Sequence, residues 1–381
     1  MTATPAAKAD LRNLSRGQLT AMVKEIGIGA TRANRIFSLL QQPGCHDLAD
    51  LTMLKRELRE KLARHGYLSH LAPATVEKSS DGTSKLAFRL ADGAMIESVL
   101  IPTEHDRHTL CVSSQVGCAM GCRFCLTGTM GFTRNLTPAE IVNQVLATIE
   151  YMTAQGIHRA TPREFINNLV FMGMGEPLAN YDNLLTALNI LMDVLGLEFT
   201  ERRVTVSTCG IVPRIADLGR DTRVNLAISM HSADDATRSR LMPVNRTYPL
   251  EQLLAACRAF PLGKKKVILI EYILLEGIND SDEDARLLAE KLSGIPCRIN
   301  LLPYNQSADL PYRPPAPEQV KRFQKILRDQ GFLTLVRDSR GADISAACGQ
   351  LAGKIPSDGR KTARRAAEPH HPTVDSPPKQ R

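Results

Sequence analysis

The first 73 residues place apolar side chains at the spacing of short helices. Apolar residues recur every three to four positions from Leu11 to Ile26, and Ser15 stands among them as a candidate N-cap. A Gly-Ile-Gly break follows at 27–29, and further helices are predicted at 31–40 and 51–65. We expect residues 1–73 to form a small helical accessory domain. Its basic second helix suits contact with an RNA backbone, and a plain packing role fits the pattern equally well.

Residues 74–110 change to the alternation that is typical of strands. Strands are predicted at 74–77, 85–90 and 95–101, with Asp-Gly turns at 81–82 and 92–93. The segment is expected to form a small antiparallel sheet that leads into another strand at 109–114. Glu97 lies on the third strand, where a lone acid is usually a solvated surface residue.

From residue 137 onward, helices alternate with nearly continuous apolar strands. Thr137, Pro138 and Glu140 have the pattern of a capping box with proline in the first turn. Counting the strand at 109–114, six strand–helix units can be recognised, which indicates a parallel sheet covered by helices. We predict an α/β fold in which residues 111–352 form a partial (β/α)6 barrel. Functional groups should then lie at the C-terminal ends of the strands.

Polar residues follow several of these strands and should share one rim of the barrel. They are Gly175 and Glu176 after the second strand, Ser207 on the third, Ser229 and His231 on the fourth, and Asn305 after the sixth. Each residue alone is more often an ordinary loop residue than a ligand contact. Their common position makes the rim a candidate binding site.

Three cysteines, Cys118, Cys122 and Cys125, have the spacing C-x3-C-x2-C. Three thiolates in one short loop can hold three irons of a [4Fe–4S] cluster and leave the fourth iron open. The alternatives are a zinc site completed by a distant ligand and a set of buried thiols without chemistry. A disulfide framework does not suit a chain of this length without an export signal.

Composition adds limits to this picture. The 381 residues are 43% hydrophobic and 23% charged, with a net charge of +8. No apolar run is long enough to cross a membrane and no secretory signal is visible, so we expect a cytoplasmic protein. Residues 353–381 are rich in proline and basic residues without periodicity, and we expect a disordered basic tail. The mild basic excess is compatible with an RNA partner and equally with a solvated surface.

Six motifs together resemble the RlmN family of radical S-adenosylmethionine (radical SAM) enzymes over roughly residues 10–352. They are C-V-S-S-Q-V-G-C-x3-C-x-F-C at 111–125, G-F-x-R-N-L at 131–136, F-M-G-M-G-E-P at 171–177, V-S-T at 206–208, S-M-H-S at 229–232 and R-G-x-D-I-x-A-A-C-G-Q-L at 340–351. The resemblance implies methylation of C2 of an adenosine in 23S ribosomal RNA and of an adenosine beside the tRNA anticodon. Cfr-type relatives methylate C8 instead, and the wording of the motifs here is closer to the C2 enzymes.

The resemblance also implies a role for each matching residue. Cys118, Cys122 and Cys125 are the implied ligands of a [4Fe–4S] cluster. The implied contacts to S-adenosylmethionine are Gly175, Glu176, Ser207, Ser229, Met230, His231 and Asn305. Cys348 is the implied methyl carrier, which becomes an S-methylcysteine, Cys111 the thiol that resolves the RNA–protein link through a disulfide, and Glu97 the proton acceptor.

The implied reaction uses two molecules of S-adenosylmethionine, one as methyl donor and one as the source of a 5′-deoxyadenosyl radical. A radical route suits the target because C2 of adenine is an electron-poor carbon without useful nucleophilicity. The implied partners are 23S ribosomal RNA, tRNA and an electron donor such as flavodoxin, and we expect a monomer. Two other classes remain open at this point: a radical SAM protein with another substrate, and an RNA-binding protein whose cluster is structural.

Overall fold

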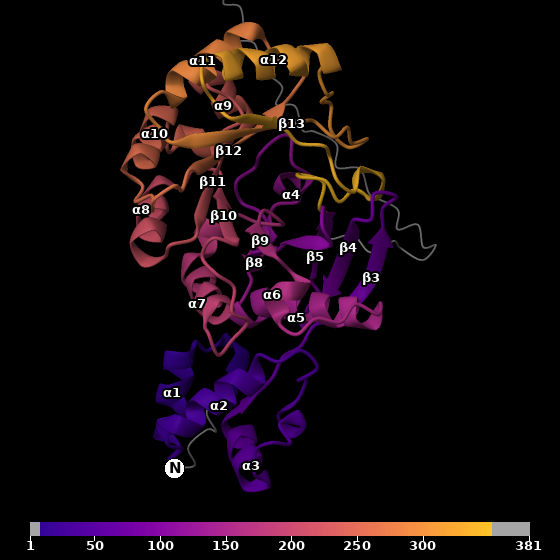
Figure 1. Cartoon of the computed structure of the whole chain (residues 1–381), viewed down its shortest axis with the longest axis vertical. Coiled ribbons are helices and arrows are strands. Elements are labelled where there is room, and N and C mark those ends of the chain that lie inside the picture. The colour runs from indigo at the N-terminus through magenta and orange to yellow at the C-terminus, as the bar shows by residue number, and fades with distance from the viewer. Residues whose placement is uncertain (1–7, 353–381) are drawn as a thin grey trace, which may run out of the picture.

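The computed structural model describes residues 8–352. At the N-terminal end, three helices and one short parallel strand pair form a unit beside the rest of the chain (Figure 1). These elements are β1 (Ala9–Asp10), α1 (Arg16–Glu25), α2 (Ala30–Leu40), α3 (Arg56–His65) and β2 (Gly66–Tyr67). Ser15 caps α1 through a capping box with Gln18, as the sequence predicts. The third helix starts five residues later than predicted, because a 3-10 turn, Leu48–Asp50, and a short loop precede it.

Most of the remaining strands belong to one ten-stranded sheet in the order β14-β13-β12-β11-β10-β9-β6-β5-β4-β3. Its parallel strands are β6 (Arg107–Cys111), β9 (Asn168–Phe171), β10 (Val204–Thr208), β11 (Asn225–Ser229), β12 (Ile268–Leu274), β13 (Cys297–Pro303) and β14 (Thr334–Val336). Its antiparallel strands are β3 (Pro73–Lys78), β4 (Ser84–Arg89) and β5 (Met95–Thr103). The antiparallel strands therefore continue the barrel sheet instead of forming a sheet of their own.

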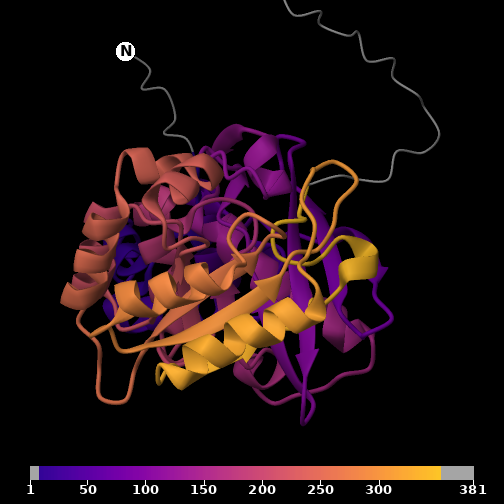
Figure 2. The ribbon, with the colours of Figure 1, turned by 90° about the horizontal axis from the view of Figure 1, so that it is seen from above.

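Helices cover the outer face of this curved sheet, as the view from above shows (Figure 2). They are α5 (Pro138–Ala154), α6 (Pro162–Phe165), α7 (Tyr181–Met192), α8 (Val212–Asp221), α10 (Leu250–Ala259), α11 (Asp282–Leu292) and α12 (Pro317–Asp329). The α/β class and the partial barrel predicted from the sequence are confirmed. The sequence did not predict α9 (Asp235–Leu241), because its residues are mostly polar and lack an apolar stripe.

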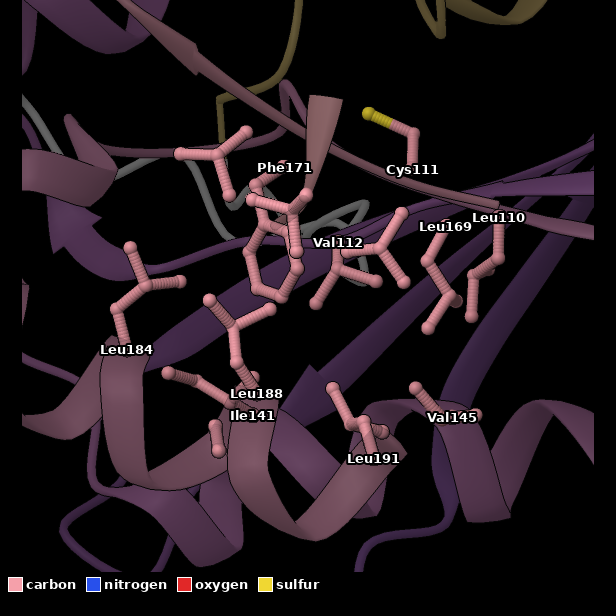
Figure 3. Packing of buried hydrophobic residues seen from close by; sticks show 14 of the residues in the cluster. Leu110, Cys111, Val112, Ile141, Val145, Leu169, Phe171, Leu184, Leu188 and Leu191 are labelled. Atoms are coloured by element: carbon pink, nitrogen blue, oxygen red, sulfur yellow. The ribbon is translucent and has the colours of Figure 1, made fainter. Parts of the chain in front are cut away.

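Strand β6 separates the core from the barrel interior. Leu110 and Val112 point toward the leucines of α7 and the aliphatic residues of α5, whereas the sulfur of Cys111 between them points away from that packing (Figure 3). Successive side chains of a strand lie on opposite faces, so the apolar residues on either side of Cys111 determine its direction. The thiol of Cys111 consequently belongs to the interior face of the barrel sheet.

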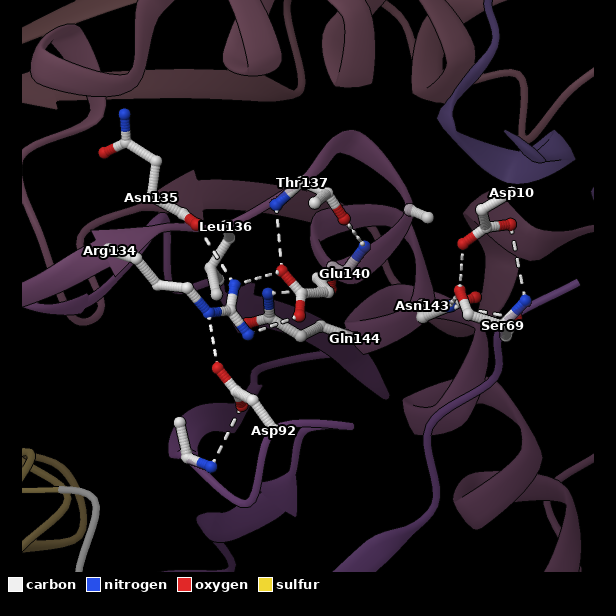
Figure 4. Close-up of polar contacts among 12 residues, drawn as sticks. Asp10, Ser69, Asp92, Arg134, Asn135, Leu136, Thr137, Glu140, Asn143 and Gln144 are labelled. Atoms are coloured by element: carbon white, nitrogen blue, oxygen red, sulfur yellow. Dashed lines mark hydrogen bonds and ion pairs between the residues drawn. The ribbon is translucent and has the colours of Figure 1, made fainter. Parts of the chain in front are cut away.

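A buried arginine joins the N-terminal helices to α5. Arg12 is 2% exposed and donates to the carbonyls of Leu40 and Ser69 and to the side chain of Asn143. Asp10 accepts from Ser69, and Asn143 donates to the same residue, so both sides of the junction share this network (Figure 4). Loss of one member of such a buried charged network costs about 3–5 kcal/mol. Arg12 therefore fixes how the N-terminal helices sit on the barrel.

None of the helices between residues 8 and 352 is both long enough and apolar enough to cross a membrane. The predicted basic tail, 353–381, lies outside the described residues.

Candidate active site

The loop with the three clustered cysteines is closed by a small hairpin. It lies between β7 (Gln115–Gly117) and α4 (Leu126–Thr129), and β7 pairs with β8 (Phe132–Asn135). The backbone N–H of Cys118 donates to the carbonyl of Gly131 at 2.8 Å. A Cβ atom at Gly117 would lie 2.0 Å from that carbonyl oxygen, so only glycine permits this close approach.

The hairpin is anchored to the body of the sheet by charged side chains. Arg134 on β8 forms ion pairs with Asp92, in the turn before β5, and with Glu140 on α5 (Figure 4). The two pairs raise the pKa of Arg134. Because Glu140 also completes the capping box of α5 with Thr137, the start of α5 and the cysteine loop are held in one arrangement.

Each of the three thiols needs a nearby positive charge before it can lose its proton, because its surroundings raise its pKa. The pKa of Cys118 is raised to about 12, mainly by burial, with contributions from the charges of Glu176 and Cys125. The pKa of Cys122 is also raised by burial and then by the charges of Cys125 and Cys118. Metal coordination supplies that positive charge and deprotonates a thiol outright. The mutual effects on the pKa values show that the three thiols share one local environment.

The donor set fits a cluster better than a single ion. Across residues 8–352, no group of three or more His, Cys, Asp and Glu side chains converges closely enough to hold one metal ion. In a [4Fe–4S] cluster each cysteine binds a different iron, so the sulfurs need not converge on one point. Three thiolates match the three irons that a cluster with one open iron needs. Cys118, Cys122 and Cys125 are the residues that would hold the cluster.

An apolar wall adjoins these thiols. Phe124, Leu241, Met242, Ile273 and Tyr304 form a buried cluster with Cys122 and Cys125 packed against it. Such surroundings exclude water from the site. Phe124 also contacts His231 edge-on, with 4.8 Å between ring centroids, so the cysteine loop meets the end of β11 directly.

Glu176 and Gly175 lie in the loop after β9, next to the cysteine hairpin. The N–H of Glu176 donates to Gln115 at 2.8 Å, and a Cβ at Gly175 would lie 2.5 Å from the side chain of Gln115. The Glu176 carboxylate accepts from the N–H groups of Cys209 and Leu178 at 2.8 and 3.0 Å. Burial raises the pKa of Glu176, and these N–H donors lower it. The two residues are thus held beside β7 and the end of β10.

A second buried arginine connects the ends of β10 and β11. Arg238 on α9 is fully buried and donates to the carbonyls of Cys209, Ser229 and Met230. It stabilises the left-handed turn into His231, whose φ is 55°. Ser207 lies in β10 and pairs with Ala227, which is two residues before Ser229 on β11. The structure therefore brings Ser207, Ser229 and His231 to neighbouring positions at the C-terminal end of the sheet.

His231 is a neutral side chain in this structure. Burial, and after it the positive charge of Arg238, lowers its pKa to about 3. Its Nδ1 accepts from the N–H of Ile273 at 3.0 Å, which leaves the proton on Nε2. Asn279 donates to the His231 carbonyl and holds the strained turn. The side chain can therefore donate one hydrogen bond from Nε2.

The other rim residues differ in their surroundings. Met230 has a fully buried side chain in the main core, and its backbone groups bond to Glu271 and Arg238. Asn305 follows β13 and accepts a long hydrogen bond, 3.5 Å, from Gln350. Asn305 thereby touches the C-terminal loop.

Cys348 lies in that C-terminal loop, residues 341–352, which we call the Cys348 loop. It runs directly against the cysteine loop. The N–H of Leu126 donates to the carbonyl of Gly349 at 2.7 Å, and Thr127 donates to the carbonyl of Leu351 at 2.6 Å. Cys348 as a whole residue is exposed. Desolvation by the surrounding protein nevertheless raises its pKa to about 11, followed by the charges of Glu271 and Cys125. Cys348 thus lies between the C-terminal loop and the cysteine loop, at a position that we term the recess.

Cys111 and Glu97 lie on adjacent strands beside this recess. Burial raises the pKa of Cys111, and the charge of Cys348 is the second cause, so the two thiols are within electrostatic reach. No disulfide joins them, since all nine cysteines are free. Glu97 is 2% exposed, and its carboxylate accepts from the N–H of Ala352 at 3.0 Å. It is a buried residue at the end of the Cys348 loop, not the solvated acid that its strand position suggested.

Sequence reasoning missed several polar residues inside the barrel. Glu271 on β12 accepts from Asn300 on β13 at 2.7 Å, and burial raises its pKa. The signal was present as an acid within the apolar run V-I-L-I-E-Y-I-L-L. Arg238 gave no such signal, because an arginine on a short polar helix looks like a surface residue. Its burial follows only from the packing of α9 against two strand ends.

A separate hollow of about 610 Å³ lies near the opposite ends of the strands. Phe199, Thr222 and Arg223 are among its lining residues, and it contains none of the predicted site residues. The charges around it are mixed, with Arg163 and Arg220 beside Glu198 and Asp221. The hollow therefore does not compete with the recess as the active site.

Comparison with known proteins agrees with this geometry. Residues 112–289 match the model of the radical SAM superfamily. A protein of Desulfotalea psychrophila named "Dual-specificity RNA methyltransferase RlmN" is 52% identical over 91% of this chain and 95% of its own length. A protein of Geobacter sulfurreducens with the same name is 50% identical over 91% of this chain and 92% of its own length.

The chain belongs to the RlmN family. A radical SAM methyltransferase from Sphaerobacter thermophilus, solved as a crystal structure, superposes with a TM-score of 0.83 at 42% identity and covers 91% of this chain and 100% of its own. As a radical SAM enzyme, an RlmN-family protein uses a [4Fe–4S] cluster and S-adenosylmethionine. The family assignment predicted from the motifs is confirmed.

Proposed function

We propose that this protein is a radical SAM RNA methyltransferase that methylates C2 of an adenosine in 23S ribosomal RNA and of the adenosine beside the tRNA anticodon. The relatives at 50–52% identity carry the name of a dual-specificity RNA methyltransferase. One observation supports the proposal most strongly. The loop that carries Cys348 is hydrogen-bonded at Gly349 to Leu126, beside the clustered cysteines, and at Ala352 to Glu97 on β5, the strand that pairs with Cys111 on β6. A cluster-bearing protein with a purely structural role has no need for that arrangement.

Different residues of the chain bind the cluster and S-adenosylmethionine. Cys118, Cys122 and Cys125 hold the cluster, and the rim residues Gly175, Glu176, Ser207, Ser229, Met230, His231 and Asn305 hold S-adenosylmethionine. When bound, the cluster and S-adenosylmethionine supply a transferable methyl group and a 5′-deoxyadenosyl radical. The neutral His231 offers a donor at Nε2, and the carboxylate of Glu176 suits an ammonium group.

Cys348 carries the methyl group as a thioether, because a cysteine thiolate is the nucleophile that a sulfonium methyl requires. Cys111 releases the RNA: its thiolate forms a disulfide with the Cys348 sulfur, the bond from that sulfur to the methylene carbon on adenine breaks, and the carbon takes a proton to become the methyl group. The buried position of Cys111 keeps it protonated and unreactive until the Cys348 sulfur is in place. Glu97 accepts a proton next to the loop that carries Cys348.

The RNA must present its adenine unstacked, because the Cys348 recess lies inside a barrel mouth that a duplex cannot enter. The N-terminal helices, residues 1–73, and the basic tail, 353–381, add contacts to the RNA backbone. The protein works as a monomer in the cytoplasm, and a low-potential donor such as flavodoxin supplies the electron.

The test is mass spectrometry of nucleosides from 23S ribosomal RNA and from tRNA after incubation with anaerobically reconstituted protein, reductant and S-adenosylmethionine. We expect 2-methyladenosine in both RNAs. 8-Methyladenosine would assign the protein to Cfr-type regiochemistry. No methylated adenosine in either RNA, with an intact cluster, would refute the proposal.

A further inference from the structure

Lys85 lies between two carboxylates on the face of the sheet that points into the barrel. This is an unusual place for a lysine. Its side chain is 8% exposed, although lysine is rarely buried unless it is paired. Its Nζ lies 3.0 Å from Glu77 and 4.0 Å from Glu97. The strand register explains this grouping, because Lys85 pairs directly with Glu77 on β3 and lies diagonal to Glu97 on β5.

The third partner of Lys85 is not on the sheet. Its Nζ donates to the carbonyl of Ile344 at 2.7 Å, and Ile344 stands four residues before Cys348 in the C-terminal loop. The Ile344 carbonyl thus accepts a hydrogen bond from Nζ, while Glu77 and Glu97 lie around the same ammonium group as ion-pair partners. Lys85 thus contacts the Cys348 loop at its start, while Glu97 contacts the same loop at its end through the N–H of Ala352.

The turn between β3 and β4 adds two further contacts to this loop. Asp81 accepts from the N–H of Gly341 at 3.0 Å, and Asp343 accepts from the N–H of Ser80 at 3.0 Å. A Cβ at Gly341 would lie 2.7 Å from Ala346, so the loop also folds tightly on itself. The antiparallel strands β3, β4 and β5 therefore form a platform under the loop.

We infer that Lys85 is a positioning residue, which holds the Cys348 loop on this platform and keeps the Glu97 carboxylate in register with it. The inference rests on the proposed function for the role of Cys348. Lys85 itself touches neither RNA nor cofactor in this scheme. A displacement of about 1 Å of the methyl-carrying sulfur would lower kcat by roughly 10- to 100-fold.

The test compares Lys85→Met, Lys85→Arg and a matched control, Lys78→Met, in the full-length reconstituted protein. Lys78 is an exposed lysine on β3 whose Nζ bonds to Gln155 at 2.8 Å, away from the loop. The methionine side chain is only one atom shorter than that of lysine, and it removes the charge and the N–H donors of Lys85. Arginine keeps the charge and can still reach the Ile344 carbonyl.

Hydrogen exchange gives a readout that does not depend on activity. In Lys85→Met, we expect faster exchange in residues 341–352 and unchanged exchange in β12, with kcat lowered and KM for RNA unchanged. Lys85→Arg should recover much of both losses, and Lys78→Met should match the wild type. Exchange in 341–352 that stays at the wild-type rate in Lys85→Met would overturn the inference, as would a rise spread evenly over the chain in both Lys85 variants.

The two proposals fail in different ways. If the wild type methylates neither RNA, the proposed function is wrong, and the local change in exchange still decides whether Lys85 holds the loop. If the wild type is active and Lys85→Met keeps its kcat, the positioning role is wrong and the proposed function stands.

Discussion

The N–H of Leu126, the residue after the last clustered cysteine, donates to the carbonyl of Gly349, the residue after Cys348, at 2.7 Å. One hydrogen bond therefore joins two loops that are more than two hundred residues apart in the chain. The contact fixes the spacing between the cluster site and the methyl-carrying sulfur. It also makes the backbone at Gly349 sensitive to substitution.

Replacing Gly349 by alanine should weaken this contact. Gly349 has a φ of +81°, and a Cβ there would lie 3.5 Å from the carbonyl oxygen of Phe124. The left-handed backbone costs about 1–2 kcal/mol with any side chain. Gly331→Ala is the matched control, because Gly331 has a φ of +87° and open space around it. We expect Gly349→Ala to lose methylation while keeping iron content, and Gly331→Ala to keep both.

Replacing each of the two reactive cysteines by alanine should stop the reaction at a different stage. Cys348→Ala removes the methyl carrier, so the protein should bind iron normally and methylate no RNA. Cys111→Ala removes the resolving thiol, so a covalent RNA–protein adduct should accumulate and be visible by denaturing electrophoresis. Cys257→Ala is a control, since Cys257 is buried on α10 away from the recess. Full turnover by either site variant would contradict the assigned roles.

Replacing Glu176 by glutamine should disturb the rim without changing its shape. Both carboxylate oxygens of Glu176 accept backbone N–H groups, so an amide must place its NH2 against one of them. The mismatch should lower the free energy of unfolding by about 1–3 kcal/mol. Binding of S-adenosylmethionine, measured by calorimetry, should weaken as well. Glu251→Gln is the control, with a side chain that is 74% exposed.

His231 should make the stability of the protein depend on pH in the acid range. Its pKa is lowered from an ordinary 6.5 to about 3 in the folded state. The unfolded chain therefore binds the extra proton first, and stability present above pH 6.5 is lost as the pH falls toward 3. The loss is about 1.4 kcal/mol per pH unit within that window.

Chemical denaturation of the wild type and of His231→Asn between pH 7 and 4 checks this dependence. Asparagine tolerates the left-handed backbone at this position and offers an oxygen acceptor for the N–H of Ile273, but it does not titrate. The variant should show a shallower fall in stability over this range. Equal slopes for the two proteins would assign the acid sensitivity to other groups.

The local pattern of residues was sufficient to predict much of the fold and part of the candidate site. The capping boxes at Ser15 and Thr137 predicted helix starts, and the apolar strands that alternate with helices predicted the partial barrel. The spacing of Cys118, Cys122 and Cys125 predicted a three-thiol loop, because short-range spacing alone determines which ligands one loop can supply. These features depend on residues close together in the chain.

The tertiary structure alone decided what surrounds those features. The fold brings Glu97 into contact with the Cys348 loop and buries Lys85 between two carboxylates. It also buries Arg238, which lies on a mostly polar helix, at the ends of two strands. Each of these contacts joins separate elements of the fold. The physical reason is that burial and partner choice depend on which distant segments pack together, and a side chain's own neighbours in sequence carry little information about that.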